Sequence, residues 1–142
     1  LAFDIQPHAL KNTKKRQSQP GVPHNCRLIL DSHSHMEQYA DAGTISCITF
    51  NLGYLPGGDH SLSTRADTTL SAVRQGLTLL QKDGLMVLCI YSGGNTGFEE
   101  REALLPFLKA LDPQKYLVIL STYYNRPNHP PMPVLIRRLS GL

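Results

Sequence analysis

Residues 64–91 read TRADTTLSAVRQGLTLLQKDGLMVLCIY and contain a helix signal followed by a strand signal. Thr64 stands three residues before Asp67, an arrangement close to a capping box. After it, apolar residues recur at the spacing of one helix face: Ala66, Leu70, Val73, Leu77 and Leu80. Residues 82–84 are expected to end this helix. Residues 85–91 form a nearly continuous apolar run, typical of a strand covered on both faces in a parallel sheet.

The same alternation extends outward in both directions along the chain. Toward the N-terminus we expect strands that end at Asp4, Asp31 and Asn51, a helix from Pro7 to about Gln19, and a short helix over residues 35–39. Toward the C-terminus we expect a helix that ends near Leu111, and two strands over residues 116–124 and 134–139. This order predicts an α/β fold with a mostly parallel sheet and an antiparallel last strand.

Length and composition favour one globular domain. The chain has 142 residues, of which 41% are hydrophobic, so we expect residues 1–142 to form a single domain and exclude wholesale disorder. No apolar run approaches the roughly 20 residues that span a bilayer, and no signal-peptide pattern is seen, which favours a cytoplasmic protein with no membrane partner. The net charge of +3 is compatible with a nucleic-acid partner without requiring one. Cys26, Cys47 and Cys89 each lie in a stretch that is predicted to be a strand, and they are expected to be reduced core thiols.

Polar residues follow the first two predicted strands. Ligands of open α/β sheets bind beyond the carboxyl ends of the strands, so these residues are candidates for a site. Asp4 either accepts the ribose hydroxyls of a nucleotide or favours the N-terminus of the next helix. Asp31, Ser32 and His33 either hydrogen-bond an adenine edge or cap the short helix that follows. The residues alone leave both pairs of alternatives open.

The third strand ends in the sharpest feature of the sequence, residues 51–59, NLGYLPGGD. The amide oxygen of Asn51 is suited to accept a hydrogen from a substrate amine, and Tyr54 is suited to stack on a nucleobase. Glycines such as Gly57 let the backbone approach a ligand closely. The alternative is a turn-rich surface loop, which is less favoured because long irregular loops in compact domains are usually functional.

Two further features of the sequence bear on a site. Residues 125–131, NRPNHPP, join the last two strands at the same sheet edge and form either the rim of a pocket or a stiff connection without function. His33 and His35, with His24 or His60, make only a weak metal pattern because no carboxylate stands at a set spacing from them. We therefore expect no metal site.

These motifs together resemble a family of small class I S-adenosylmethionine-dependent methyltransferases labelled rRNA methylases. Its better-defined members methylate the 5-aminomethyl group of the tRNA wobble uridine, giving 5-methylaminomethyl-(2-thio)uridine. The resemblance spans the whole chain and rests on residues 3–6 (FDIQ), 31–33 (DSH), 50–59 (FNLGYLPGGD), 68–69 (TT) and 90–91 (IY), on Gly93, Gly94 and Gly97, on residues 99–100 (EE), and on Asn125, Asn128, Pro130 and Pro131. It implies a Rossmann-like sheet and S-adenosyl-L-methionine as the cofactor.

The resemblance also implies a set of cofactor-binding residues: Asp4, Gln6, Asp31, Ser32, His33 and Asn51. Among them, Asp4 would hold the ribose, and Asp31 with Ser32 or His33 would flank the adenine. Residues 51–54 occupy the place of the Asn-Pro-Pro-Tyr type of motif found in amino-group methyltransferases. Leu-Gly replaces its two prolines here, so the rigid turn is absent.

A larger departure lies at the start of the chain. Family members begin with a strand and a Gly-rich loop, and that strand lies at the centre of the sheet, between the strands that end at Asp4 and Asn51. This chain begins after both segments. We therefore expect the sheet to lack its first, central strand, the domain to be an N-terminally truncated part of a longer enzyme, and the cofactor affinity of the truncated chain to be poor.

The function implied is methyl transfer to the 5-aminomethyl amine of the wobble (2-thio)uridine, with the tRNA anticodon loop as partner. Asn51 and Tyr54 are the expected catalytic residues. The expected substrate-binding residues are Tyr54, Gly57, Asp59, Asn125 and Asn128. The alternatives are a methyltransferase of rRNA or of a small molecule, and a non-catalytic nucleotide- or RNA-binding remnant. Whether the protein is a monomer or a homodimer is left open.

Overall fold

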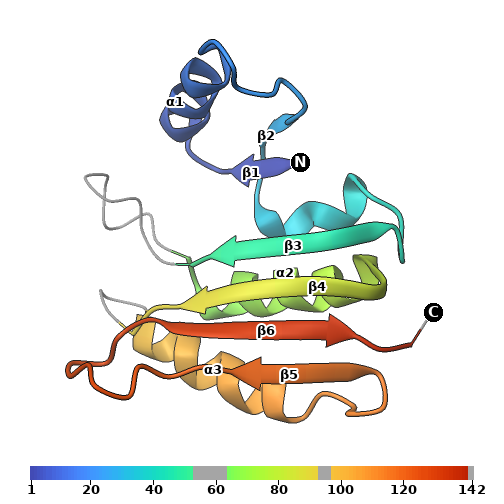
Figure 1. Ribbon diagram of the computed structural model, residues 1–142, viewed down its shortest axis with the longest axis vertical. Coiled ribbons are helices and arrows are strands. Elements are labelled where there is room, and N and C mark those ends of the chain that lie inside the picture. The colour runs from blue at the N-terminus through green and yellow to red at the C-terminus, as the bar shows by residue number, and fades with distance from the viewer. Residues whose placement is uncertain (53–63, 93–96, 141–142) are drawn as a thin grey trace.

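The computed structural model describes residues 1–52, 64–92 and 97–140, and its elements alternate as expected (Figure 1). In chain order they are β1 (Ala2–Asp4), α1 (Pro7–Gln17), β2 (Leu28–Leu30), the 3-10 helix η1 (His33–Gln38), β3 (Ile45–Asn51), α2 (Ala66–Leu79), β4 (Leu80–Ile90), α3 (Gly97–Lys109), β5 (Tyr116–Leu120) and β6 (Met132–Arg138).

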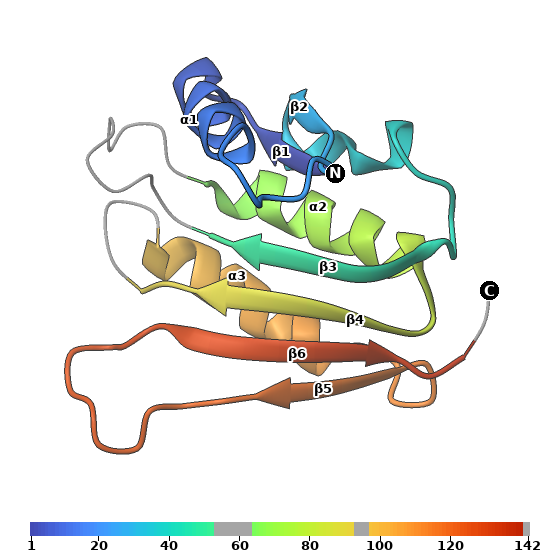
Figure 2. The ribbon, with the colours of Figure 1, turned by 45° about the horizontal axis from the view of Figure 1, so that its top comes forward.

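The described strands form two sheets. β1 and β2 pair in parallel with each other, and the second sheet has the order β3-β4-β6-β5. β3 and β4 are parallel, whereas β6 runs antiparallel to both of its neighbours, as predicted. Among the described residues no strand lies between β1 and β3, which are the facing edges of the two sheets (Figures 1 and 2).

The hydrophobic core lies between the larger sheet and two helices. α2 and α3 pack on one face of this sheet (Figure 2). The helix side chains meet a row of fully buried strand residues: Met86, Leu88, Ile90, Val134 and Ile136. Burial of each such side chain contributes about 1.5–3 kcal/mol. α2 approaches closely because a Cβ at Gly76 would lie 2.5 Å from Cε of Met86.

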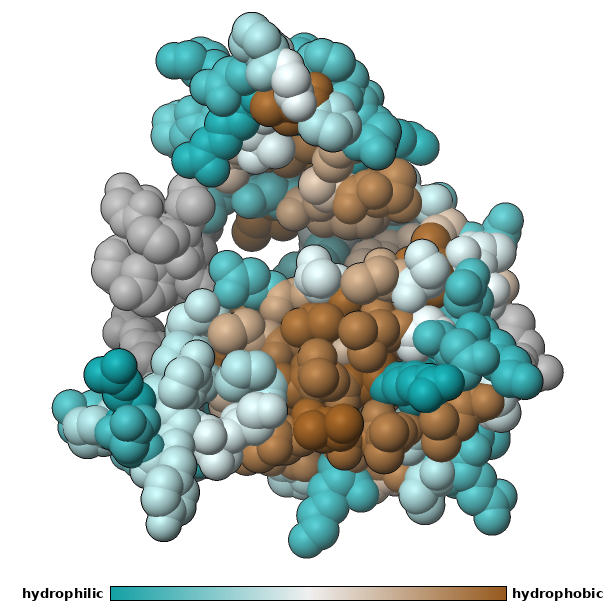
Figure 3. All heavy atoms as spheres, in the orientation of Figure 1, coloured by the Kyte–Doolittle hydropathy of each residue, from teal (hydrophilic) through white to brown (hydrophobic). Residues whose placement is uncertain are grey.

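The expectation that β4 is covered on both faces is wrong for the described residues. From Leu85 to Ile90 its residues alternate between half-buried and buried, because described helices cover only one face of the sheet. The opposite face is apolar and open in Figure 3, and on β5 it includes side chains that are nearly half exposed, Leu117 and Ile119.

Both ends of α2 differ from the prediction. Thr64 does not cap the helix: Arg65 is the N-cap residue and makes no side-chain cap hydrogen bond. The helix ends at Leu79 and β4 begins at once, so residues 82–84 belong to the strand. The cause is the buried Arg138, whose guanidinium donates to backbone carbonyls at this junction, including that of Leu80 at 2.6 Å. A guanidinium with its five N–H donors satisfies the last carbonyls of the helix in place of a turn residue.

Two other expectations are corrected. The cysteines are free but are not core residues: Cys47 is exposed on β3, where it lines a cavity, and Cys26 and Cys89 are only partly buried. Cys26 also lies before β2 rather than in it. β5 ends at Leu120 instead of residue 124, since after the hydrogen bond from Ser121 N to Pro133 O the chain leaves the sheet.

Within the described ranges, no helix has the length and apolar character that crossing a membrane requires.

Candidate functional site

A cavity of about 440 Å³ separates the two sheets and reaches the carboxyl end of β3. Figure 3 shows the molecule hollowed at this level. The cavity is lined by Phe3 of β1, by His33 and Met36 of η1, and by Phe50 and Asn51 of β3. β1 and β3 point the same way, so their carboxyl ends lie at one edge of the molecule (Figure 1). The fold thus brings together two of the predicted site residues, His33 and Asn51.

Asp4 and Gln6 lie just outside this cavity lining. The Asp4 Oδ1 atom accepts a hydrogen bond of 2.8 Å from the backbone N–H of Gln6, the residue that precedes α1. This contact fits the reading of Asp4 as a residue that organises the start of the next helix. Among the described residues its second oxygen has no partner, so the predicted ribose contact remains open to it.

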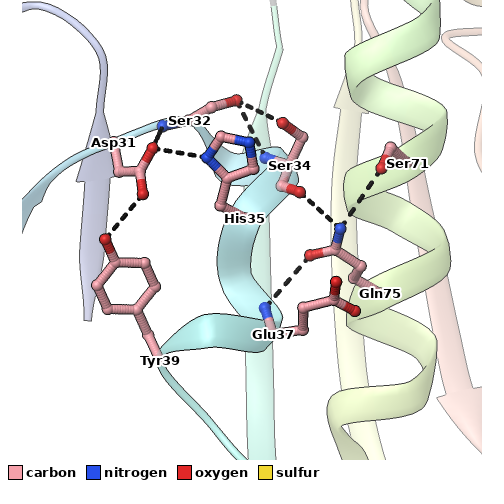
Figure 4. Close-up of polar contacts among 8 residues, drawn as sticks. All are labelled: Asp31, Ser32, Ser34, His35, Glu37, Tyr39, Ser71 and Gln75. Carbon is pink, nitrogen blue, oxygen red and sulfur yellow. Dashed lines mark hydrogen bonds and ion pairs between the residues drawn. The ribbon is translucent and has the colours of Figure 1, made fainter.

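Asp31 is the centre of a hydrogen-bonded cluster at the end of β2 (Figure 4). Its carboxylate accepts from His35 Nδ1 at 2.8 Å, from the Tyr39 hydroxyl at 2.7 Å and from Ser32 N at 2.7 Å. The bond with His35, followed by those with Tyr39 and Ser32, lowers the pKa of Asp31. Ser32 is the N-cap of η1 and accepts from Ser34 N. Ser32 therefore fulfils the capping alternative, whereas Asp31 holds the same helix through His35 and Tyr39; the contact of either residue with adenine stays a prediction.

η1 is fixed in turn to α2 by one glutamine. Gln75 donates from Nε2 to the carbonyl of Ser34 and accepts at Oε1 from Glu37 N (Figure 4). An amide that donates and accepts on the same short helix restrains both its position and its rotation. This places η1, and with it His33, firmly over the cavity.

His33 presents an unused polar atom. Its Nε2 is buried and has no hydrogen-bond partner, while the ring lies edge-on to Phe50 with centroids 6.1 Å apart. Burial lowers the pKa of His33, so the ring is neutral near pH 7. A buried nitrogen without a partner is costly, and a ligand that bonds to it would remove that cost.

The Asn51 side chain is held by a residue from the neighbouring strand. The Tyr91 hydroxyl, just beyond β4, donates to Asn51 Oδ1 at 3.1 Å. Interaction with the Cys89 side chain, followed by burial, raises the pKa of Tyr91, so this hydroxyl remains a donor through neutral pH. Gly97 explains how α3 starts so close by, because a Cβ there would lie 2.9 Å from the Tyr91 carbonyl oxygen. Sequence reasoning gave Tyr91 no role, although its position after a strand was the available signal.

A buried carboxylate on α3 links this helix to residues near the start of α2. Glu100 of α3 is only 1% exposed and accepts hydrogen bonds from the hydroxyls of Thr69 and Thr64. Thr64 is the first described residue after residues 53–63. Glu100 therefore joins Thr64 to α2 and α3, a role that was also missed.

The remaining predicted residues are not gathered here. Asn125 and Asn128 are exposed on the connection between β5 and β6 and do not line the cavity between the sheets. Tyr54, Gly57 and Asp59 lie outside the described residues. Within the parts of the chain that the structure describes, no group of three or more His, Cys, Asp or Glu side chains is placed to hold a metal.

Comparison with known proteins identifies the family of the chain. The family described as "Putative rRNA methylase" matches residues 1–137, which is nearly the entire chain. The chain belongs to the rRNA methylase family. This finding confirms the resemblance drawn from the sequence motifs.

Among solved structures, the rRNA methylase fold recurs closely. A putative rRNA-methylase from Clostridium thermocellum is 42% identical, with a TM-score of 0.91 over 96% of this chain and 73% of that chain. A putative methyltransferase from Streptococcus mutans, solved in complex with SAH, is 37% identical, with a TM-score of 0.87 over 97% of this chain and 74% of that one. These likenesses confirm the Rossmann-like fold of class I methyltransferases.

A curated relative carries a more specific name. The chloroplastic tRNA (mnm(5)s(2)U34)-methyltransferase of Arabidopsis thaliana is 33% identical over 141 residues, or 96% of this chain. The chain spans about half the length of that relative, 52%.

Proposed function

We propose that the protein is an S-adenosylmethionine-dependent methyltransferase of tRNA, whose target is the 5-aminomethyl amine of the wobble (2-thio)uridine. Its family, the SAH complex of the Streptococcus mutans relative and the name of the Arabidopsis thaliana relative support this proposal. The observation that carries it is the Asn51 amide, held by Tyr91 at the edge of a cavity that two parallel strands line.

The residues at the cavity fit the cofactor. S-adenosylmethionine supplies a methyl group that its sulfonium already activates. Asp4, at the end of β1, has a carboxylate oxygen available for ribose hydroxyls. The buried Nε2 of His33 offers a hydrogen-bonding position suited to the edge of an adenine, and Phe50 beside it supplies an apolar surface. Gln6, Asp31 and Ser32 complete the proposed set.

In this proposal, Asn51 orients the amine that is the nucleophile. A carbonyl oxygen accepts two hydrogen bonds, and Tyr91 takes only one of these positions on Oδ1. The other is available to an amine hydrogen, which would turn the nitrogen lone pair toward the methyl group. Correct orientation of two reacting groups lowers the barrier substantially without any strong base, provided that the amine is neutral. Tyr54, Gly57, Asp59, Asn125 and Asn128 stay proposed contacts of the nucleotide, and the anticodon loop of tRNA stays the proposed partner.

The substitution Asn51→Ala in the full-length protein tests this role. Turnover of aminomethyl-bearing tRNA should fall on the order of a hundredfold, the size of effect found when one positioned hydrogen-bonding group is removed from a reaction centre. Calorimetry should show nearly unchanged S-adenosylmethionine affinity. Asn12→Ala, at an exposed position on α1, is the matched control. Unchanged turnover in the Asn51 variant would remove this residue from the mechanism.

The choice of substrate separates the proposal from its rivals. The family description favours rRNA as the second candidate target. Methylation of tRNA that bears the aminomethyl group, and not of tRNA without it, supports the proposal, whereas methylation of rRNA or of a free small molecule alone overturns it. Cofactor binding without any methyl transfer would point instead to a nucleotide-binding remnant.

A further inference from the structure

A second cavity lies beyond the carboxyl end of β4, next to the residue that follows Tyr91. It has a volume of about 250 Å³ and is formed by the ends of β4 and β6, by α3 and by the connection between β5 and β6. Ser92, which lines it, directly follows Tyr91, the residue that holds Asn51. Tyr123, also in the lining, is close enough to Tyr91 to influence its pKa. The cavity is therefore a neighbour of the proposed methyl-transfer site.

The charged side chains that line this cavity are arginines. Arg101 of α3 and Arg126 of the connection both line it, together with His129, and none of the described lining residues carries a carboxylate. Among the described residues neither guanidinium has a hydrogen-bond or ion-pair partner. Two unpaired guanidiniums that converge on a space of this size are suited to a phosphate, whose oxygens match their planar forks of N–H donors.

The connection that carries Arg126 is built to hold its shape. Asn128 and His129 have φ angles of 64° and 50°, in the left-handed region, and two prolines follow them. The His129 ring packs edge-on against Phe98 of α3, with centroids 5.5 Å apart. A strained backbone persists only where its surroundings enforce it, and such strain is concentrated at binding sites.

An aromatic surface accompanies the charge. Tyr123 lines the cavity and is 51% exposed, and the next residue, Tyr124, is fully exposed. Exposed aromatic rings beside arginines are typical of proteins that bind single-stranded nucleic acid, because bases stack on the rings while cations hold the backbone.

We propose that this cavity binds the phosphodiester next to the target nucleotide, with Arg101 and Arg126 on one phosphate and Tyr123 stacked on the adjoining base. The inference rests on the proposed function, since it supplies the strand contact that would hold the wobble nucleotide against Asn51. It assigns RNA binding to Arg101 and Arg126, to neither of which the sequence analysis gave a role of its own.

The test compares wild-type full-length protein with Arg126→Ala and with the double variant Arg101→Gln/Arg126→Ala. Binding of a fluorescently labelled anticodon stem-loop RNA is measured by anisotropy over a series of salt concentrations. The double variant should bind on the order of tenfold more weakly, and the slope of log K against log[salt] should become shallower by about 0.7, the value for one phosphate of a single strand. Arg16→Ala, a solvated position at the end of α1, should leave the slope unchanged.

Methyl transfer to the free nucleoside 5-aminomethyluridine, which lacks a phosphate, should be the same in all variants. Arg126 is exposed, so its single substitution should not impair folding, and it should weaken RNA binding at least about threefold even if the double variant is unstable. An unchanged salt slope, or an equal loss of nucleoside methylation, overturns the phosphate site.

The two proposals fail in different ways. Arginine-dependent RNA binding without methylation of any aminomethyl substrate would leave the phosphate site standing and overturn the proposed function. Methylation of tRNA with RNA binding that is independent of both arginines would do the reverse.

Discussion

Replacement of Tyr91 by Phe isolates the contact that holds Asn51. The ring stays in place, and only the hydroxyl that donates to Asn51 Oδ1 at 3.1 Å is lost. A hydrogen bond between neutral groups contributes about 0.5–1.5 kcal/mol net, and the lower part of this range applies because both side chains are partly exposed. About 0.5–1 kcal/mol corresponds to roughly twofold to fivefold slower methyl transfer, at about 1.36 kcal/mol for each factor of ten.

Single-turnover transfer of a radiolabelled methyl group to aminomethyl-bearing tRNA measures this loss. Cofactor affinity should be unchanged. The raised pKa of Tyr91 keeps the hydroxyl protonated, so the ratio of wild-type to variant rates should stay constant between about pH 7 and pH 9. Tyr116→Phe, at the opposite edge of the sheet, is the control.

A double substitution gives the decisive comparison. If Tyr91 acts only through Asn51, then Tyr91→Phe should add nothing to the loss caused by Asn51→Ala. Additive losses, or a single Tyr91 variant as fast as wild type, would refute the view that this hydroxyl orients the amide.

Two further predictions concern stability. Glu100→Ala removes the acceptor of the buried Thr69 hydroxyl and one acceptor of the partly buried Thr64 hydroxyl, and should lower the free energy of unfolding by about 2–4 kcal/mol in a denaturant titration. The exposed Glu99→Ala should change it by less than about 0.5 kcal/mol, and a similar effect of both would contradict the anchoring role. Because burial lowers the pKa of His33, the unfolded chain takes up the proton first as the pH falls, so the stability from this residue is present above about pH 6.5 and is lost below it. His33→Phe should remove this dependence in thermal melts between about pH 7 and pH 5, whereas His24→Phe, at an exposed position, should retain it.

Much of the fold was predictable because it depends on local periodicity. The helix face that includes Val73 and Leu77 and the apolar run of β4 required only neighbouring residues, and their alternation determined the parallel arrangement. The start of β4 was not predictable in this way. Residues 81–83 are polar, and the register between β3 and β4 shifts across them, from Ile45 opposite Leu80 to Cys47 opposite Leu85. The carbonyls at the junction are taken up by Arg138, which is far away in sequence.

In the candidate site, too, features that depend on local sequence were predictable and features that depend on distant residues were not. Asp4 and Asn51 were located from the rule that parallel strands end at one edge, and that rule needs no knowledge of side-chain partners. The contact from Tyr91 to Asn51 and the burial of Glu100 depend on how separate elements pack, so the residue types alone gave them no role. The expectation of buried cysteines failed for a related reason: Cys47 lies on the edge strand that faces the cavity.

In the part of the chain that the structure describes, β1 pairs only with β2, and this has a consequence for hydrogen exchange. No residue of α1 is buried, and this small parallel pair shares no described ladder with the larger sheet. Segments with few buried contacts open at a low free-energy cost, so amide protons of α1 should exchange far sooner than those of β4. A ligand in the cavity that both sheets line would add contacts to each sheet. Its affinity would then be measurable as slowed deuterium uptake in α1, although this helix does not itself line the cavity.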